Sequence, residues 1–338
     1  MGAIRTPQVS VQSVGGFVMG YGRGGTAPSR GLWLWLVVLT GLWTRTGVAE
    51  DAQGIALQLV SGEKKAGQEL KVETLLAGSS QKKTKDESTR TLPLAGLSEP
   101  SQRLVNAVLQ SAALYRRLPT IRTQVDHRVY RFFADHPDVA VSLWRAMGVS
   151  KLEMHQTGEF EYEADAKDGT LGVITILRRT PTDCLIHCSG MFQSPVLSKP
   201  IQAQAVLYVR TSFEVDNNGQ QLVTHTADMF VAFPSQTVET VAKAMAPISN
   251  KITDKNFEEV SLFLRMMQLA MTQQPGWVEQ IASKLEGVMP GRSDTLLEVT
   301  AQCYIDEKRR IGEIAGVPMT LDQVRPPVAV APMITMPR

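Results

Sequence analysis

Apolar and polar residues alternate through the middle of the chain, between residues 151 and 233. In KLEMHQTGEFEYEAD, the apolar residues Leu152, Met154 and Tyr162 fall on even positions, whereas the glutamates fall on odd positions. A period of two is typical of a strand with one buried face, so we interpret the glutamates as a solvated face rather than as acid–base catalysts. Turn sequences such as DNNG at 216–219 separate the alternating segments. The pattern predicts an antiparallel β-meander of about five or more strands.

A helical period occupies the segments on both sides of this alternation. Ser98 can cap a first helix that Pro119 would end, and Ser235 and Asp254 can cap two successive helices after the strands. These elements predict an α+β fold, in which the meander packs against a long C-terminal helix and further helices precede and follow it. The expected helices cover 98–117, 138–147, a segment after Ser235, 254–274, a short segment through 285 and 294–312, and 120–136 is ambiguous between helix and strand.

The order of the elements is defined by two segments that flank the meander. The segment FFADHPDVAVSLWRAMG precedes the meander, and the apolar helix over 254–274 follows it. In this order, residues 120–275 resemble the helix-grip fold of the START-like superfamily. The resemblance rests on element order and includes no diagnostic motif, and the helices after 275 depart from it. It implies an apolar cavity between a curved sheet and the long helix.

The N-terminal region has the pattern of a secretory signal peptide. Its apolar run between Arg30 and Arg45 has 14 residues, about 21 Å of helix against the roughly 30 Å of a bilayer core. The small-x-small sequence GVA ends at Ala49, and no acidic residue precedes Glu50. We therefore expect residues 1–49 to be a signal peptide, with 1–18 an over-extended gene start. The protein would be exported to the periplasm, the envelope or the extracellular space, with transient membrane contact during export. An uncleaved N-terminal tether is the alternative.

The remaining chain divides by composition. Residues 50–97 are polar, most clearly in GSSQKKTKDESTR, and are predicted to be a linker with room for short strands near 55–60 and 69–76. Residues 98–315 form the predicted α+β domain. The Pro-rich residues 316–338 are predicted to be a disordered tail.

The net charge does not indicate a nucleic-acid partner. The whole chain carries 35 basic and 33 acidic residues, but four of the arginines lie in the leader. Without the leader, 31 basic and 33 acidic residues remain, a net charge of −2. The basic isoelectric point is therefore largely a property of the leader, and no nucleic-acid binding is expected.

Three cysteines allow at most one disulfide, and the sequence leaves open whether Cys303 would pair with Cys184 or Cys188. Cys184, His187 and Cys188 lie close in sequence, which raises the question of a metal site. On a strand, the two cysteines would be about 13 Å apart on one face, with the histidine on the other. One ion cannot bridge that distance. We expect neither a metal nor a cofactor.

The candidate binding residues lie where the strands and the long helix would meet. His225 shares its parity with apolar neighbours and should face inward, where a hydrogen-bonded core histidine is the commoner interpretation. Met266, Met267 and Met271 on the long helix could adapt to an apolar ligand or could fill the core. Trp144 on the preceding helix completes the candidate set.

Other patterns in the sequence give weaker indications of function. Five arginines between 116 and 131 could bind an anion, but a solvated, partly paired surface is the simpler interpretation. The sequence contains no nucleophile elbow, zinc-protease motif or nucleotide-binding loop, so no catalytic residue is assigned and the hypothesis leans away from an enzyme.

The leading hypothesis is an exported, non-catalytic protein that binds an apolar small molecule or lipid. The alternative is an envelope interaction or structural protein with a fully packed core and no ligand.

Overall fold

The computed structural model describes residues 70–193 and 199–316. All described residues belong to one compact unit of the chain. The predicted leader, the predicted strand near 55–60 and almost all of the predicted tail lie outside the described residues. Within these residues, no helix is both long enough and apolar enough to cross a bilayer.

The predicted α+β fold is confirmed. In the described part of the chain, nine strands form one antiparallel sheet in the order β1-β3-β9-β8-β7-β6-β5-β4, and β2 also pairs with β9. Strands β4 to β9 follow one another in sequence, which confirms the predicted meander. The strands are β1 (Glu73–Leu76), β2 (Ala112–Arg117), β3 (Thr120–Gln124), β4 (Glu153–Gly158), β5 (Glu161–Asp165), β6 (Thr170–Arg179), β7 (Asp183–Phe192), β8 (Ile201–Val215) and β9 (Gln221–Ala232).

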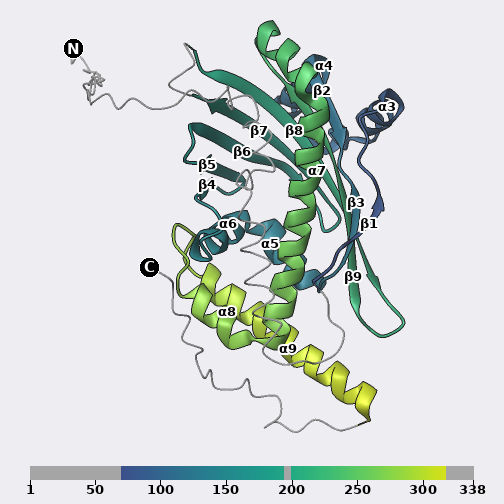
Figure 1. Cartoon of the computed structure of the whole chain (residues 1–338), viewed down its shortest axis with the longest axis vertical. Helices are drawn as coiled ribbons and strands as arrows, with labels where there is room; N and C mark the ends of the chain where they lie inside the picture. The colour runs from purple at the N-terminus through teal and green to yellow at the C-terminus, as the bar shows by residue number, and fades with distance from the viewer. Residues whose placement is uncertain (1–69, 194–198, 317–338) are drawn as a thin grey trace, which may run out of the picture. The chain divides into compact units, whose positions relative to one another are not determined.

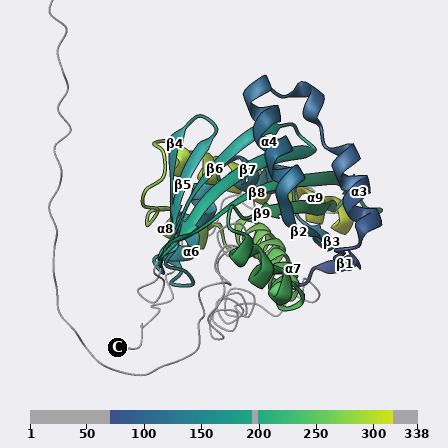
Figure 2. The same ribbon diagram turned by 90° about the horizontal axis from the view of Figure 1, so that it is seen from above.

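Helices cover both faces of this sheet (Figures 1 and 2). On one face lies α7, which contacts β2 and β3, and on the other lie α3 and α4, which contact β2, β8 and β9. Alternation within each strand therefore decides which helix a side chain meets. The helices are α3 (Lys82–Thr91), α4 (Glu99–Ser111), α5 (His127–Asp135), α6 (Pro137–Ala146), α7 (Gln236–Gln273), α8 (Pro275–Ala282) and α9 (Arg292–Ala315), with a 3₁₀ turn η1 (Leu94–Gly96).

Helix α7 is longer than predicted, because the two helices expected after Ser235 and Asp254 are one. The Ser235 side chain accepts a hydrogen bond from Val238 N, so the predicted cap is present. Asp254 does not begin a helix; instead, its carboxylate pairs with Arg116 of β2. No glycine lies between Pro247 and Asp254, and the helix continues through both.

Helix α4 begins as predicted but ends earlier. The Ser98 side chain accepts a hydrogen bond from Ser101 N at 3.4 Å. The helix stops at Ser111, and the next six residues form β2, which pairs with Ala232 to Asp228 of β9. The prediction of a helix to residue 117 was wrong because strand pairing with β9 overrode the helical spacing. The ambiguous segment before Pro137 contains both a strand, β3, and a helix, α5.

The predicted linker over 78–90 is largely the helix α3. It contacts β2 and has one fully buried side chain, Ser88. The helix attaches to the sheet through polar contacts, and its sequence, KKTKDESTRT, contains no apolar residue. The hydrophobic pattern of the sequence therefore did not indicate a helix here. Strand β1 lies within the segment where a short strand was expected.

Candidate functional site

The four apolar candidates meet in one buried cluster between the sheet, α6 and α7. Trp144, Met266, Met267 and Met271 all belong to it. Met267 and Met271 have 0% of their surface exposed, and the Trp144 ring packs edge-on against Phe263 with centroids 5.3 Å apart. These contacts are those of a close-packed core. A ligand-binding role for these four side chains stays a prediction.

His225 faces α7 from β9, as its parity predicts, and both ring nitrogens have partners. Nδ1 lies 3.2 Å from the Tyr130 hydroxyl, and Nε2 lies 2.7 Å from Ser261 Oγ. Because Ser261 Oγ donates to the carbonyl of Phe257, it accepts from Nε2–H of His225. The Tyr130 hydroxyl then donates to Nδ1 and accepts from Thr211 Oγ1 at 2.9 Å. The imidazole is thus satisfied as a neutral ring.

Burial lowers the pKa of His225 to about 4. The Phe257 ring lies over the imidazole with centroids 4.7 Å apart, which removes water from its face. A histidine with this pKa carries no charge at neutral pH and gives up no proton there. The geometry is that of a hydrogen-bonded core residue of β9 that packs against α7, the helix that carries the methionine cluster.

Cys184, His187 and Cys188 lie on β7, as the strand interpretation requires. Both cysteines face the α7 side, where they join apolar clusters. His187 falls on the opposite parity with Leu185, beneath α4. All three cysteines of the chain are free thiols. No group of three metal-ligating side chains occurs among the residues that the structure describes.

The arginines between 116 and 131 are mostly bound to carboxylates of the chain. Arg116 pairs with Asp254 of α7, and Arg128 contacts Asp126 and Asp306 at 2.7 and 2.8 Å. The guanidinium of Arg128 holds the pKa of Asp126 below its usual value despite the burial of that carboxylate. These pairs connect β2 to α7 and α5 to α9, rather than presenting a free cationic surface.

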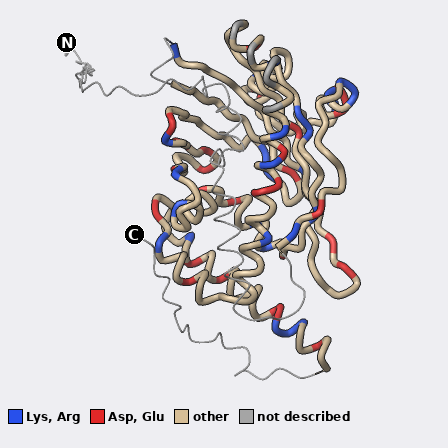
Figure 3. The backbone as a smooth tube through the Cα atoms, in the orientation of Figure 1, with Lys and Arg blue, Asp and Glu red and all other residues tan. Residues whose placement is uncertain are grey.

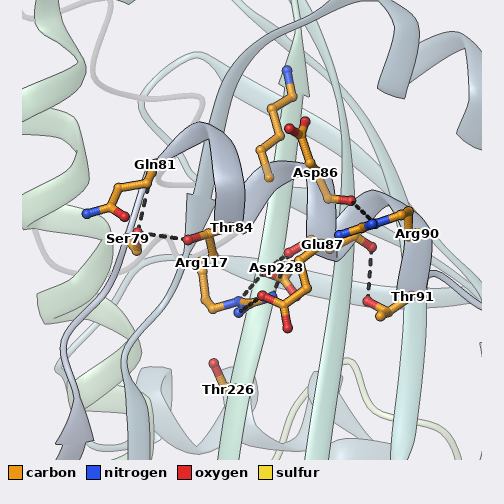
Figure 4. A network of polar contacts seen from close by, with 12 residues as sticks. Ser79, Gln81, Thr84, Asp86, Glu87, Arg90, Thr91, Arg117, Thr226 and Asp228 are labelled. Atoms are coloured by element: carbon orange, nitrogen blue, oxygen red, sulfur yellow. Dashed lines mark hydrogen bonds and ion pairs between the residues drawn. The ribbon is translucent and has the colours of Figure 1, made fainter.

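Sequence reasoning missed a buried polar network on the α3 side of the sheet (Figure 4). At its centre is Asp228 of β9, which is 0% exposed. Its Oδ1 accepts hydrogen bonds from Ser88 Oγ (2.6 Å), the Tyr115 hydroxyl (2.8 Å) and Arg117 Nε (2.9 Å). Its Oδ2 accepts one from Arg210 Nη2 at 2.6 Å. The one available signal was a lone acid at the start of the apolar run DMFVAF.

This network joins three segments that are distant in sequence. Ser88 is separated from Asp228 by 140 positions, and Arg117 also contacts Glu87 of α3 at 3.2 Å. Burial is the largest influence that raises the pKa of Tyr115 above its usual value. Because both oxygens of the Asp228 carboxylate accept hydrogen bonds, the arrangement can hold α3 on the sheet.

A second buried pair lies where α6 begins. Arg292 of α9 contacts both Asp138 and Gln156. Burial, with Arg292 next in importance, lowers the pKa of the neighbouring His136. Asp138 Oδ2 and His136 Nδ1 are buried without a hydrogen-bond partner in the described residues. Buried atoms of this kind are commonly satisfied by internal water, so the pair is interpreted as structural.

A row of very small side chains crosses four strands on the α7-facing side of the sheet. Ala164 pairs with Gly172, Gly172 with Gly190, and Gly190 with Ala203. The two alanines are buried members of the apolar clusters on that face. Glycine and alanine extend less far from the sheet than the larger side chains of the neighbouring rows. The surface of the sheet is therefore recessed along this row.

Among the described residues, these features define an α+β protein whose antiparallel sheet carries helices on both faces. No protein-family model and no curated protein matches the chain. Among solved structures, it is similar to a conserved protein from Geobacillus kaustophilus at 13% identity and a TM-score of 0.32, over 45% of this chain and 93% of that one. It is also similar to DynU16, a protein in the dynemicin biosynthetic locus, at 13% identity and a TM-score of 0.21. That match spans 42% of this chain and 47% of DynU16. At these TM-scores, neither likeness assigns a function.

Proposed function

We propose that this chain is an exported, non-catalytic protein that binds an apolar ligand or lipid between its sheet and α7, in the manner of START-like helix-grip proteins. The row of small side chains across β5 to β8 is the observation that carries this proposal. Apolar residues flank the row on the same face, among them Ile174, Cys188 and Phe192. Ligand sites are typically lined in this way, with few polar groups.

The proposed ligand lies beside the methionine cluster, not inside it. Met267 and Met271 are enclosed by neighbouring side chains, whereas glycine and alanine at the row present little volume. Met266 would then form part of the nearest wall, where a flexible thioether adapts to chains of different shape.

Native mass spectrometry of the purified full chain tests this function. The parent protein should carry adducts with lipid masses, and it should bind the fluorescent fatty acid cis-parinaric acid. Gly190→Val places a branched side chain in the row while keeping a residue suited to strands. We expect this variant to lose the adducts and to bind the probe at least tenfold more weakly, with the fold retained.

Ser189→Val is the matched control, because residue 189 lies on the same strand but faces the other side of the sheet. It should bind the probe like the parent. Parent protein without adducts and without probe binding would remove the proposal. Equal binding by the Gly190 variant would place the ligand elsewhere.

The packing of the methionine cluster favours the second candidate, an envelope interaction or structural protein with a filled core. The ring of Phe263 packs edge-on against Trp144 and also against Phe133, at 5.2 Å between centroids for the latter. If side chains pack equally densely over the row of small side chains, Gly190→Val overpacks this face of the sheet. The free energy of unfolding then falls by about 1–3 kcal/mol. A lower melting temperature together with an absence of lipid in the parent would support this candidate.

Export forms a separate part of the proposal and rests on the N-terminal sequence. N-terminal sequencing of protein from its native host should give a first residue of Glu50, after cleavage at the small-x-small site. A sequence that begins before residue 45 would contradict cleavage and leave the tethered alternative.

A further inference from the structure

A polar pocket lies where β3, the β8–β9 turn, α7 and α9 meet. Its volume is about 280 Å³, slightly below the ~300–1,000 Å³ that suits drug-sized ligands. Four glutamines contribute to its lining, among them Gln220 of the turn and Gln221, the first residue of β9. The pocket is separate from the apolar face discussed above, and its wall is rich in groups that form hydrogen bonds.

Arg265 of α7 forms the buried part of this wall. Only 4% of the residue is exposed, and its Nη1 donates to the carbonyl of Gln124 at 2.8 Å. Burial lowers the pKa of Arg265 to about 10, and the nearby charge of Glu307 partly opposes this shift. A buried cation is costly unless an anion compensates it. An anionic group in the pocket would supply that compensation.

The carboxylates around the pocket are largely neutralised by other arginines. Arg310 binds Glu307 through two contacts of 2.9 and 2.8 Å. Arg128 holds Asp126 and reaches Asp306 at 2.8 Å. Glu313 lies exposed at the rim, near the end of α9, where Figure 3 shows acidic and basic residues following one another. A dianion would meet several carboxylates here, whereas a ligand with both charges would meet a partner for each.

We propose that this pocket binds a small zwitterion of amino-acid size, with its carboxylate on Arg265 and its ammonium group towards Asp306 and Glu313. The guanidinium offers a planar pair of donors that matches a carboxylate. The glutamine amides can donate to or accept from the polar body of the ligand. This site does not depend on the proposed apolar ligand.

A thermal-shift screen of the full chain against each standard amino acid, and against inorganic phosphate, tests the proposal. At least one amino acid should raise the melting temperature. Calorimetry with that amino acid and with its carboxamide derivative, which lacks the carboxylate, should show much tighter binding of the acid. Arg265→Met should weaken binding roughly 10–100-fold, as expected when a hydrogen bond to a charged group is lost.

Arg103→Gln is the control, because Arg103 is an exposed arginine of α4 outside the pocket lining. It should leave the affinity unchanged. Should the Arg265 variant fail to fold, Glu313→Gln at the exposed rim provides the second test, with a loss of roughly two- to fivefold. The proposal is overturned if no amino acid stabilises the protein, if phosphate alone does, or if the carboxamide binds equally well. An unchanged affinity in a folded Arg265 variant or in Glu313→Gln would overturn it too.

Discussion

Asp228 is a fully buried carboxylate that holds two arginines, a tyrosine and a serine. Asp228→Asn would leave Arg117 and Arg210 without their shared anion. Removing one member of a buried pair typically costs ~3–5 kcal/mol, and the partial exposure of both arginines lowers this to about 3 kcal/mol. Urea unfolding measures the loss. Asp86→Asn, on the exposed side of α3, should change stability by less than about 0.5 kcal/mol, and an equal loss in both variants would contradict the assignment.

His225 should make stability depend on pH. Its pKa is about 4 in the folded protein and about 6.5 in the unfolded chain. The unfolded state therefore binds more protons between these values, so stability is full above pH 6.5 and is lost as the pH falls towards 4. The loss from pH 7 to pH 5 should be about 2 kcal/mol.

Urea unfolding of His225→Gln at both pH values isolates this contribution, because the loss from other groups is common to parent and variant. The exposed His155→Gln is the control and should keep the full pH dependence of the parent. If His225→Gln loses as much stability as the parent, the histidine is not the group that titrates.

At single positions, the sequence predicted the direction in which a side chain points better than it predicted the residues that the side chain contacts. Strand parity placed His225 inward, because alternation depends only on neighbours in the chain. It could not show that Tyr130 and Ser261 would satisfy the ring, since both come from other elements. Asp228 was missed for the same reason, because an acid in an apolar run becomes intelligible only when Ser88 and Arg117 are placed beside it.

At the scale of elements, α7 is the helix on which the fold depends. Its C-terminal half contacts α5, α8 and α9 as well as the sheet, so a charge on the buried face of this half has no route to water. Leu264 is buried there, whereas Glu258 is exposed on the same helix. We expect Leu264→Asp to abolish soluble expression, since an unpaired buried charge costs several kcal/mol. Glu258→Lys should express and melt like the parent, and a soluble Leu264 variant of unchanged melting temperature would contradict the packing.

Element boundaries were predicted well where a local signal marks them. Ser98 and Ser235 were found as caps because a cap acts on the following turn. The end of α4 and the whole of α3 were missed, because pairing with β9 and a polar attachment to the sheet act over long distances in sequence. The predicted break before Asp254 failed because its carboxylate is engaged by Arg116.

At the scale of the described molecule, residues 70–97 belong to the folded unit and are not a linker. Leu92 and Leu97 lie in the cluster beneath α4, and Ser88 reaches Asp228. A chain that begins at residue 98 should therefore melt well below one that begins at residue 70. The loss combines an opened polar network with two exposed leucines, and amounts to several kcal/mol. Calorimetry of the two chains measures it, and equal melting temperatures would restore the domain boundary at residue 98.

The pairing of β2 with β9 has a consequence for synthesis. The partners of β2 are Asp228 to Ala232, so the ribosome must add more than a hundred further residues before this strand can be completed. At ~5–20 residues per second, that interval lasts roughly 5–25 s. During this time the carboxylate of Asp228, which Arg117 and Ser88 share in the folded protein, has not yet been made, and the early part of the chain stays open. Because the sheet cannot be completed before β9 emerges, the nascent chain stays incompletely folded for most of its translation. A chain in this state can still pass through a narrow pore.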